Sequence, residues 1–168
     1  MIFVMVGTQN LYFYRLLDAI FLAKKNGCLD GNKLVIQAGV NFNKYKDKLS
    51  EDVFIFDYID YNSIESYILD ADYVITHAGV GSILSSIQKN KKVIVVPRLK
   101  KYKEHNDDHQ LEIANKFEEL GYVLSLKDVE DLSKVMSSVM EFKPKQFLGS
   151  NKMFAERFKV ELDDFLSK

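Results

Sequence analysis

The chain has 168 residues, a formal net charge of −1 and a single cysteine, Cys28. A chain of this length holds one ordinary α/β domain with a hydrophobic core rather than two. Acidic and basic residues interleave along most of it, so no overall field indicates a nucleic-acid partner. A lone cysteine excludes an internal disulfide and fits a reducing compartment. Any anion-binding site must therefore be local.

The first six residues are apolar and no basic segment precedes them. The run is far shorter than the roughly 20 residues that a membrane-spanning helix needs. It predicts a first β-strand instead. We expect a cytoplasmic protein that reaches a membrane only through its surface or through a partner.

Short apolar runs rich in β-branched residues recur along the chain and predict its strands: residues 2–6, 34–36, 53–56, 73–75 and 93–96, with a weaker run at 122–124. The runs are continuous rather than alternating, which is typical of parallel strands covered on both faces. Apolar residues at helical spacing lie between them: Phe13, Leu16, Leu17, Ile20 and Phe21, then Ile64, Tyr67 and Ile68, then Ile83, Leu84 and Ile87. This alternation predicts an α/β fold with a Rossmann-like, doubly wound parallel sheet over residues 1–142.

The composition changes near residue 143, and residues 143–168 are predicted to form a separate helical tail. Pro144, Gly149 and Ser150 interrupt the preceding helical pattern. Apolar residues then recur at helical spacing, and they predict a C-terminal amphipathic helix: Phe154, Phe158, Leu162, Phe165 and Leu166. This helix either packs on its own domain or docks on another subunit.

Ligands of such sheets bind beyond the carboxyl ends of the strands, where the strand order reverses. Small, polar and glycine residues dominate the segments that follow the predicted strands. These segments are Gly7-Thr8-Gln9, Gln37-Ala38-Gly39, Tyr58-Ile59-Asp60, the run from His77 to Ser82, and Pro97-Arg98.

The turn from Thr76 to Ser82 has the composition of a phosphate-binding turn. Gly79 and Gly81 let backbone amides approach an anion, and the helix that begins near Ser82 favours a phosphate at its N-terminus. By itself a short G-x-G is equally typical of a turn that binds nothing. Neither a Walker loop nor the full dinucleotide fingerprint is present. A second polar turn at Gly7-Thr8 would make the pair suited to a diphosphate.

A polar segment leaves the fifth predicted strand at the same edge. Its first part, residues 98–103, is basic, and such clusters are usually solvated surface. Asp107, Asp108 and Gln110 follow where a helix should begin, and their side chains suit hydrogen bonds to sugar hydroxyls. His105 and His109 add two metal-ligating side chains, but no further ligands are evident, so we predict no metal site.

Three motifs in this order, FVMVGTQ, HAGVGS and VVPRLKKYKEHNDDHQ, resemble the C-terminal, donor-binding half of a GT-B glycosyltransferase. MurG, the small subunits of capsule and exopolysaccharide glycosyltransferases, and the eukaryotic two-subunit enzyme that adds N-acetylglucosamine to a dolichol-linked acceptor share this pattern. The resemblance covers roughly the first 125 residues. Beyond them only a helical tail is shared.

The resemblance implies a UDP-sugar substrate and no separate cofactor. It places Thr8 and the turn from Gly79 to Ser82 at the diphosphate, Ile59 at the uracil, and Asp108 with Gln110 at the sugar. The full predicted binding set is Gly7, Thr8, Gln37, Gly39, Ile59, His77, Ala78, Gly79, Val80, Gly81, Ser82, Ser85, Asp107, Asp108 and Gln110. Positive charge at the leaving diphosphate is assigned to His105 and Arg98. His77 is expected to order its loop.

One position departs from the family pattern. A glutamate usually follows the glycine turn and holds the ribose hydroxyls, and Ser85 stands there instead. A serine forfeits a charge-assisted hydrogen bond, which is worth roughly 1.5 to 3 kcal/mol.

The resemblance further implies a glycosyltransferase subunit that transfers a hexose to a lipid-linked acceptor in capsular or exopolysaccharide biosynthesis, with inversion and without a metal. GT-B enzymes need a second domain for the acceptor, so we expect a separate membrane-associated partner subunit. That partner would recruit the chain to the inner face of the plasma membrane. The alternative is a non-catalytic, nucleotide-binding or scaffold subunit of the same complex.

Overall fold

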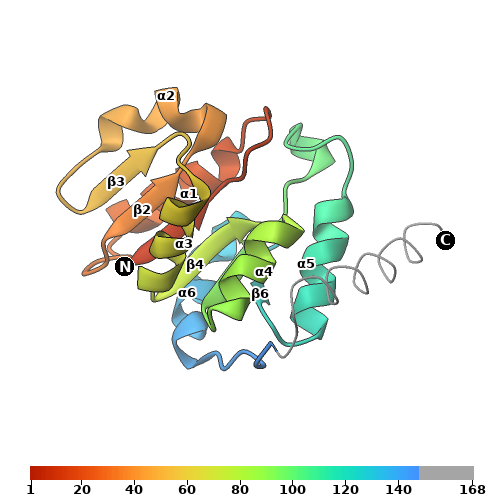
Figure 1. Cartoon of the computed structure of the whole chain (residues 1–168). Coiled ribbons are helices and arrows are strands. Elements are labelled where there is room, and N and C mark those ends of the chain that lie inside the picture. Colours follow the sequence, from red (N-terminus) through yellow and green to blue (C-terminus); the bar gives the residue numbers. More distant parts are fainter. Residues whose placement is uncertain (148–168) are drawn as a thin grey trace.

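The computed structural model describes residues 1–147, and a six-stranded parallel sheet forms its centre (Figure 1). The strands run in the order β3-β2-β1-β4-β5-β6. Their bounds are β1 Ile2–Met5, β2 Leu34–Gln37, β3 Val53–Phe56, β4 Tyr73–His77, β5 Lys92–Val96 and β6 Leu124–Ser125. Every neighbouring pair is parallel, so a helical connection returns the chain to the same edge each time.

Within residues 1–147, six α-helices connect these strands or cover them: α1 Tyr14–Lys25, α2 Phe42–Tyr45, α3 Tyr61–Asp70, α4 Val80–Gln88, α5 His109–Glu119 and α6 Leu132–Glu141. Four short 3-10 helices accompany them: η1 Gly39–Asn41, η2 Lys46–Lys48, η3 Lys100–Tyr102 and η4 Val129–Asp131. Asp60 begins α3, because its carboxylate accepts a hydrogen bond from the Ser63 amide at 3.0 Å.

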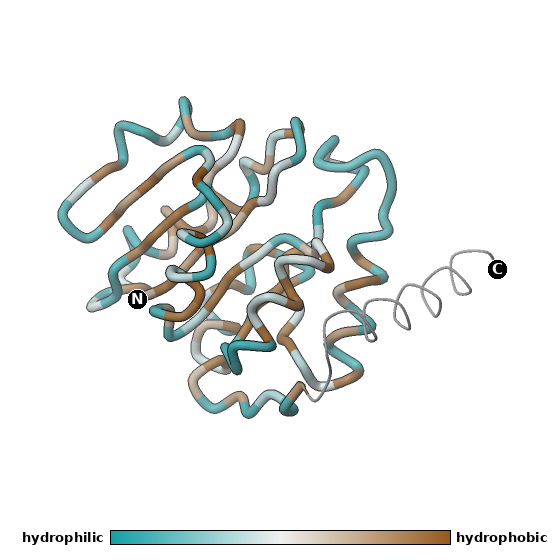
Figure 2. The backbone as a smooth tube through the Cα atoms, viewed as in Figure 1, coloured by the Kyte–Doolittle hydropathy of each residue, from teal (hydrophilic) through white to brown (hydrophobic). Residues whose placement is uncertain are grey.

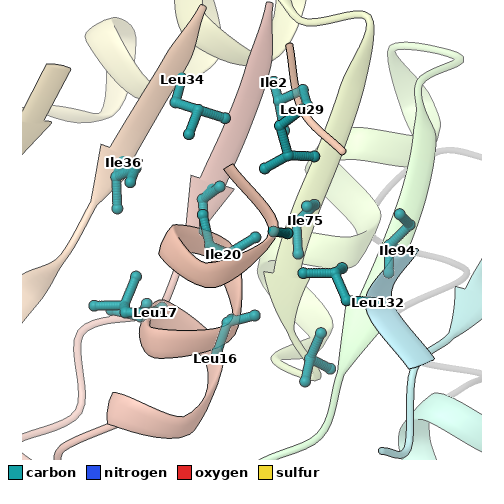
Figure 3. Close-up of a cluster of buried hydrophobic side chains, with 14 of the residues drawn as sticks. Ile2, Leu16, Leu17, Ile20, Leu29, Leu34, Ile36, Ile75, Ile94 and Leu132 are labelled. Carbon is teal, nitrogen blue, oxygen red and sulfur yellow. The ribbon is translucent and has the colours of Figure 1, made fainter. Parts of the chain in front are cut away.

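Successive strand residues point to opposite faces of the sheet and build two separate cores. On one face α1 and α6 pack over the sheet, and Figure 3 shows their contact residues: Ile2, Leu16, Leu17, Ile20, Leu29, Leu34, Ile36, Ile75, Ile94 and Leu132. On the other face α3, α4 and α5 cover the alternate strand residues, among them Phe3, Val74 and Val93. The sheet is therefore doubly wound, as the continuous apolar runs predict.

Hydropathy follows this layering. The central strands are hydrophobic, and the segments at the periphery are largely hydrophilic (Figure 2). The Rossmann-like fold class predicted from the sequence is confirmed. Along residues 1–147 no helix is long and apolar enough to span a bilayer.

After α6 the chain runs back along the domain. The amide of Lys145 donates to the carbonyl of Gly121 at 2.9 Å, and the ring of Phe147 meets that of Tyr122 edge to face. The division near residue 143 stays a prediction. The predicted amphipathic helix from Phe154 to Leu166 lies outside the described residues.

Candidate functional site

The strand order reverses between β1 and β4, and a cleft of about 240 Å³ opens beyond the carboxyl ends of these strands. We call it the donor cleft, after the sugar-nucleotide donor that the sequence resemblance implies. Eight of the residues predicted to bind the substrate line it: Gly7, Thr8, Gln37, Ile59, His77, Gly79, Gly81 and Ser82. The strand topology therefore brings these eight residues together at one edge of the sheet.

The imidazole of His77 lies between the two glycine turns. A Cβ atom at Gly7 would come within 2.6 Å of the ring, and one at Gly79 within 2.3 Å, so both positions need glycine. Gly7 also has a positive φ of 86°, a backbone conformation that other residues rarely adopt. The ring thus fills the space that two side chains would otherwise occupy.

His77 is neutral at physiological pH. Its side chain is buried, and this burial, with a smaller contribution from the charge of Arg98, lowers its pKa to about 4. Its Nδ1 atom lies 3.4 Å from the hydroxyl of Thr76. A neutral, packed imidazole is suited to supporting the turns, as the sequence predicts.

The N-terminus of α4 is open toward the cleft. Gly79 is the N-cap residue and has no side chain to accept a hydrogen bond from the first amides of the helix. The first turn contains no acidic residue. The first intrahelical bond runs from the Ile83 amide to the Gly79 carbonyl at 3.1 Å, so the amides before Ile83 have no acceptor within the helix. Free amides and the positive end of the dipole make this an anion site.

Gln37 holds the first glycine turn from below. Its Oε1 accepts from the Gly7 amide and its Nε2 donates to the Gly7 carbonyl, both at 3.2 Å, and Nε2 also donates to the Asp57 carbonyl at 3.0 Å. Gly39 packs behind this turn, because a Cβ there would lie 3.0 Å from the Gly7 oxygen. The side chain of Gln37 therefore mainly fixes the backbone of the first glycine turn. Gly39 supports the cleft without lining it.

The other end of the cleft is apolar. Tyr58 and Ile59 follow β3, and Ile64 and Met5 complete the wall. Tyr58 is 46 % exposed, so one face of its ring is open to solvent. Met5, Tyr58 and Ile64 were not among the predicted binding residues, although Tyr58 stands beside Ile59 in the predicted edge segment. The planar ring of a nucleobase could pack against this apolar wall.

The position of Arg98 contradicts the prediction that it contacts the leaving group. Its side chain is fully buried, and its guanidinium donates to the carbonyls of Val6 at 2.7 Å, Leu11 at 2.9 Å and Glu104 at 3.1 Å. Burial lowers the pKa of Arg98 to about 10, so it remains charged. Arg98 therefore ties the loop after β1 to the loop after β5. The sequence pattern did not reveal this structural role of Arg98, because a basic residue shortly after a strand is usually taken to face solvent.

Glu104 and Arg15 reinforce the same connection. The Arg15 guanidinium donates to the Glu104 carboxylate at 2.8 Å and to the Pro97 carbonyl at 2.7 Å. Glu104 also accepts from the Leu99 amide at 3.1 Å. Neither Glu104 nor Arg15 was predicted, because no short motif joins residues this far apart in the chain.

Gln110 and Asp108 are engaged in structural hydrogen bonds. The Oε1 atom of Gln110 accepts from the amides of Ala78 at 3.2 Å and Arg98 at 3.1 Å, which joins the ends of β4 and β5. Asp108 accepts from the Lys100 amide at 2.9 Å. Neither residue lines the donor cleft, so this arrangement does not bring these side chains to it as the sequence predicts.

His105 lies against the loop after β1. Its Nδ1 is 2.8 Å from Asp107 Oδ1, and its Nε2 is 3.1 Å from the Gln9 side-chain nitrogen. The Asp107 amide also approaches Nδ1, at 3.4 Å. Asp107 thereby orients the imidazole. In the described part of the chain no group of three or more acidic, histidine or cysteine side chains is arranged to hold a metal ion.

The remaining predicted residues lie around the glycine turn. Ala78 is buried, and Val80 packs against the core under α4. Ser85 lies one helical turn beyond Ser82 and is half-buried, but it does not line the cleft. A short hydroxyl at this position does not reach the cavity in this arrangement.

Residues 1–164 match the family described as the glycosyltransferase family 28 C-terminal domain. The chain belongs to this family. The resemblance to a GT-B donor-binding domain that the three motifs indicate is thereby confirmed. The family 28 match includes the whole donor cleft and all six strands.

Several relatives are named UDP-N-acetylglucosamine transferase subunit ALG13. The Saccharomyces cerevisiae protein is 42 % identical over 101 residues, which are 58 % of this family 28 chain and 48 % of the relative. The Candida glabrata protein is 50 % identical over 56 residues, 32 % of this chain and 25 % of that one. The human protein is 32 % identical over 124 residues, 73 % of this chain and 10 % of that one. The chain thus matches about half or less of the length of these relatives.

Solved structures share the family 28 architecture. A solution structure of ALG13 superposes with a TM-score of 0.63 at 25 % identity and covers 92 % of both chains. MurG of Acinetobacter baumannii gives a TM-score of 0.58 at 19 % identity, over 82 % of this chain and 40 % of that one. A glycosyltransferase of kitacinnamycin gives 0.62 at 18 % identity, over 95 % and 37 %. The last two establish likeness of fold alone.

Proposed function

We propose that this chain is the donor-binding subunit of a UDP-sugar glycosyltransferase. The donor cleft carries this proposal: the open N-terminus of α4 at Gly79 presents free amides to one small cavity, and the glycine turn at Gly7 and Thr8 lines the same cavity. The diphosphate would bind at the two turns, and the uracil would lie against Tyr58 and Ile59. UDP-N-acetylglucosamine is the first donor to test, because the relatives are named for its transfer.

The reaction would be displacement of UDP from the anomeric carbon by an acceptor hydroxyl. The bond between that carbon and the diphosphate oxygen breaks, and negative charge develops on the diphosphate. Amides held at the start of α4, with the helix dipole, would stabilise this charge without a metal. His105 is the remaining candidate for an added positive charge beside the cleft, and direct attack would invert the configuration.

The acceptor half would come from a separate partner subunit. The relatives are themselves named as subunits, which supports an assembly of two chains. The partner would hold a lipid-linked sugar at the membrane and recruit this chain there, with Phe158 and Leu162 as the predicted docking residues. Their replacement by aspartate should abolish co-purification with the partner. Capsular or exopolysaccharide synthesis remains the biological setting predicted from the sequence resemblance.

Calorimetric titration of the chain with UDP tests the donor site. We expect saturable binding with a dissociation constant in the millimolar range or tighter and a rise in the melting temperature. Uridine without phosphate should bind at least tenfold more weakly, by roughly 1.4 kcal/mol, because the glycine turns would lose their anion. Release of UDP from UDP-N-acetylglucosamine on a lipid-linked acceptor, with the partner present, then tests the enzyme activity.

A non-catalytic role is the second candidate, and the position of Ser85 favours it. A ribose held without a carboxylate is bound more weakly. Absence of both heat and thermal shift with UDP would support a scaffold subunit. UDP binding without any UDP release in the assembled complex would support a nucleotide-binding but inactive subunit.

A further inference from the structure

A second cleft of about 550 Å³ lies outside the donor cleft and shares none of its lining residues. We call it the tyrosine cleft. Its walls come from the start of α1, from the end of η3 and from η4, segments that are far apart in the chain. The Arg15 to Glu104 ion pair joins the first two walls at 2.8 Å, with side chains only 13 % and 4 % exposed. The cleft is therefore built on a fixed floor.

Two exposed aromatic rings form the mouth of the tyrosine cleft. Tyr12 is 56 % exposed and stacks on Tyr14 with a centroid distance of 4.8 Å and an interplanar angle of 19°. Tyr102 is 51 % exposed and has the Arg15 guanidinium 4.9 Å from its centroid. Each ring is thus supported by a neighbour while much of its surface remains open to solvent. Supported aromatic faces are typical of binding sites, since little side-chain entropy is lost on contact.

The polar groups of the cleft favour a neutral, hydroxyl-rich ligand. Arg15 and Glu104 neutralise each other, which leaves the ammonium of Lys103 and the carboxylates of Asp128 and Glu130 as the other charged groups of the lining. Asp128 and Glu130 are exposed, so their oxygens are available to accept hydrogen bonds. The Lys101 ammonium lies 4.7 Å from the centroid of the Tyr102 ring, so the positive and negative groups around the cleft balance, and a phosphate or a nucleotide gains no net attraction here. Donors and acceptors that stand side by side suit hydroxyl groups, which both accept and donate.

We propose that the tyrosine cleft binds a neutral saccharide, with the apolar C–H face of a pyranose ring on Tyr12 or Tyr102 and its hydroxyls on Lys103 and Glu130. The volume lies within the range of small-molecule sites, which are lined by aromatic groups with a few polar ones. Because the cleft is separate from the donor site, the sugar it holds is not the one bound to the nucleotide. The inference goes beyond the proposed function, and its test needs no catalytic activity.

The test is an amide-resolved NMR titration of the full chain with the methyl β-glycosides of glucose, galactose and N-acetylglucosamine. At least one should give saturable shifts at the amides of Arg15, Lys103 and Val129 in the millimolar range, with Gly7 and Ile59 unaffected. Tyr12→Ala and Glu130→Gln change exposed side chains, so the variants should keep the wild-type spectrum elsewhere. Loss of the aromatic contact in Tyr12→Ala should weaken binding by about fivefold.

Tyr61→Ala is the matched control, because Tyr61 is 63 % exposed and lies at the start of α3, outside the tyrosine cleft. It should leave saccharide binding unchanged. The proposal is overturned if no glycoside gives saturable shifts, if the shifts fall at Gly7 and Ile59, or if Tyr61→Ala weakens binding as much as Tyr12→Ala. It is also overturned if inorganic phosphate shifts the cleft amides more strongly than every glycoside. UDP titration of the same variants reports separately on the donor cleft.

Discussion

The ring of His77 lies so close to Gly79 that a Cβ on this glycine would come within 2.3 Å of its Nε2 atom. The same ring excludes a side chain at Gly7. One histidine therefore sets the spacing of both glycine turns, and these turns form the end of the donor cleft where we propose that the diphosphate binds. Glycine is therefore required at both positions by the packing of the His77 ring, independently of any ligand.

Gly79→Ala should disrupt this packing. We expect a loss of stability of about 1 to 3 kcal/mol from overpacking and at least a tenfold loss of UDP affinity, because the turn must shift. Gly81→Ala is the matched control for stability, since a Cβ there meets nothing within 4 Å and alanine stabilises a helix by roughly 0.5 to 1 kcal/mol. Urea denaturation and UDP titration measure both effects. Equal stability of the two variants would contradict the clash.

The free energy of unfolding should decrease as the pH is lowered, because His77 is held neutral in the folded protein. Its folded-state pKa of about 4 lies below the ordinary value of 6.5, so the unfolded chain binds a proton first as the pH decreases. The neutral ring therefore contributes stability that is complete above the unfolded pKa and is lost progressively below it. Between about pH 7 and about pH 5 the loss from this group is about 2 kcal/mol.

Urea denaturation at several pH values checks this slope. His77→Gln has no titrating ring, so its free energy of unfolding should change less over the same interval, whatever its absolute stability. Identical slopes for His77→Gln and the wild type would show that the histidine is not held neutral.

Arg98→Met should destabilise the fold rather than the reaction. The substitution leaves the carbonyls of Val6, Leu11 and Glu104 without their donor, and we expect a loss of about 2 to 4 kcal/mol. The UDP affinity of the folded protein should stay within about threefold of the wild type, since Arg98 does not reach the donor cleft. Unchanged stability with a large loss of UDP affinity would restore its predicted role at the leaving group.

Ser85→Glu should strengthen nucleotide binding if the missing carboxylate weakens it. A longer side chain one turn beyond Ser82 has the reach that serine lacks, and a charge-assisted bond to a ribose hydroxyl should raise UDP affinity by at least about tenfold. Ser85→Gln is the uncharged control and should give a smaller gain. The assignment fails if UDP binds both variants and the wild type equally.

His105→Gln tests the remaining catalytic assignment. The ring is oriented by Asp107 and contacts Gln9, beside the loop that carries Thr8. If His105 supplies the proposed positive charge at the leaving diphosphate, its replacement should lower kcat by about 10-fold to 100-fold in the assembled complex and leave UDP affinity almost unchanged. A kcat equal to that of the wild type would exclude His105 from the reaction.

The fold was predictable because parallel strands buried on both faces leave a strong local signal. The apolar run at residues 53–56 is β3 itself, and the glycine turns follow β1 and β4 as predicted. Their convergence on one cleft follows from sheet topology alone.

The network behind the cleft was not predictable, because it depends on contacts between distant segments. Arg98, Gln110 and Glu104 look like polar edge residues in the sequence, yet each is buried. Arg98 and Gln110 bond to backbone groups of distant segments, and Glu104 pairs with Arg15 of α1. A polar side chain carries no local mark of whether it faces solvent or a carbonyl. Periodicity reports burial of apolar residues only.

The Arg98 guanidinium donates hydrogen bonds to the carbonyls at both ends of the short segment from Val6 to Leu11. That segment carries Gly7 and Thr8 of the donor cleft, and Tyr12 of the tyrosine cleft follows it directly. The donor cleft and the tyrosine cleft thus lie at opposite ends of one short segment, and the buried guanidinium of Arg98 fixes both ends of that segment. A nucleotide and a sugar bound to the same chain would be held at a separation set by Arg98.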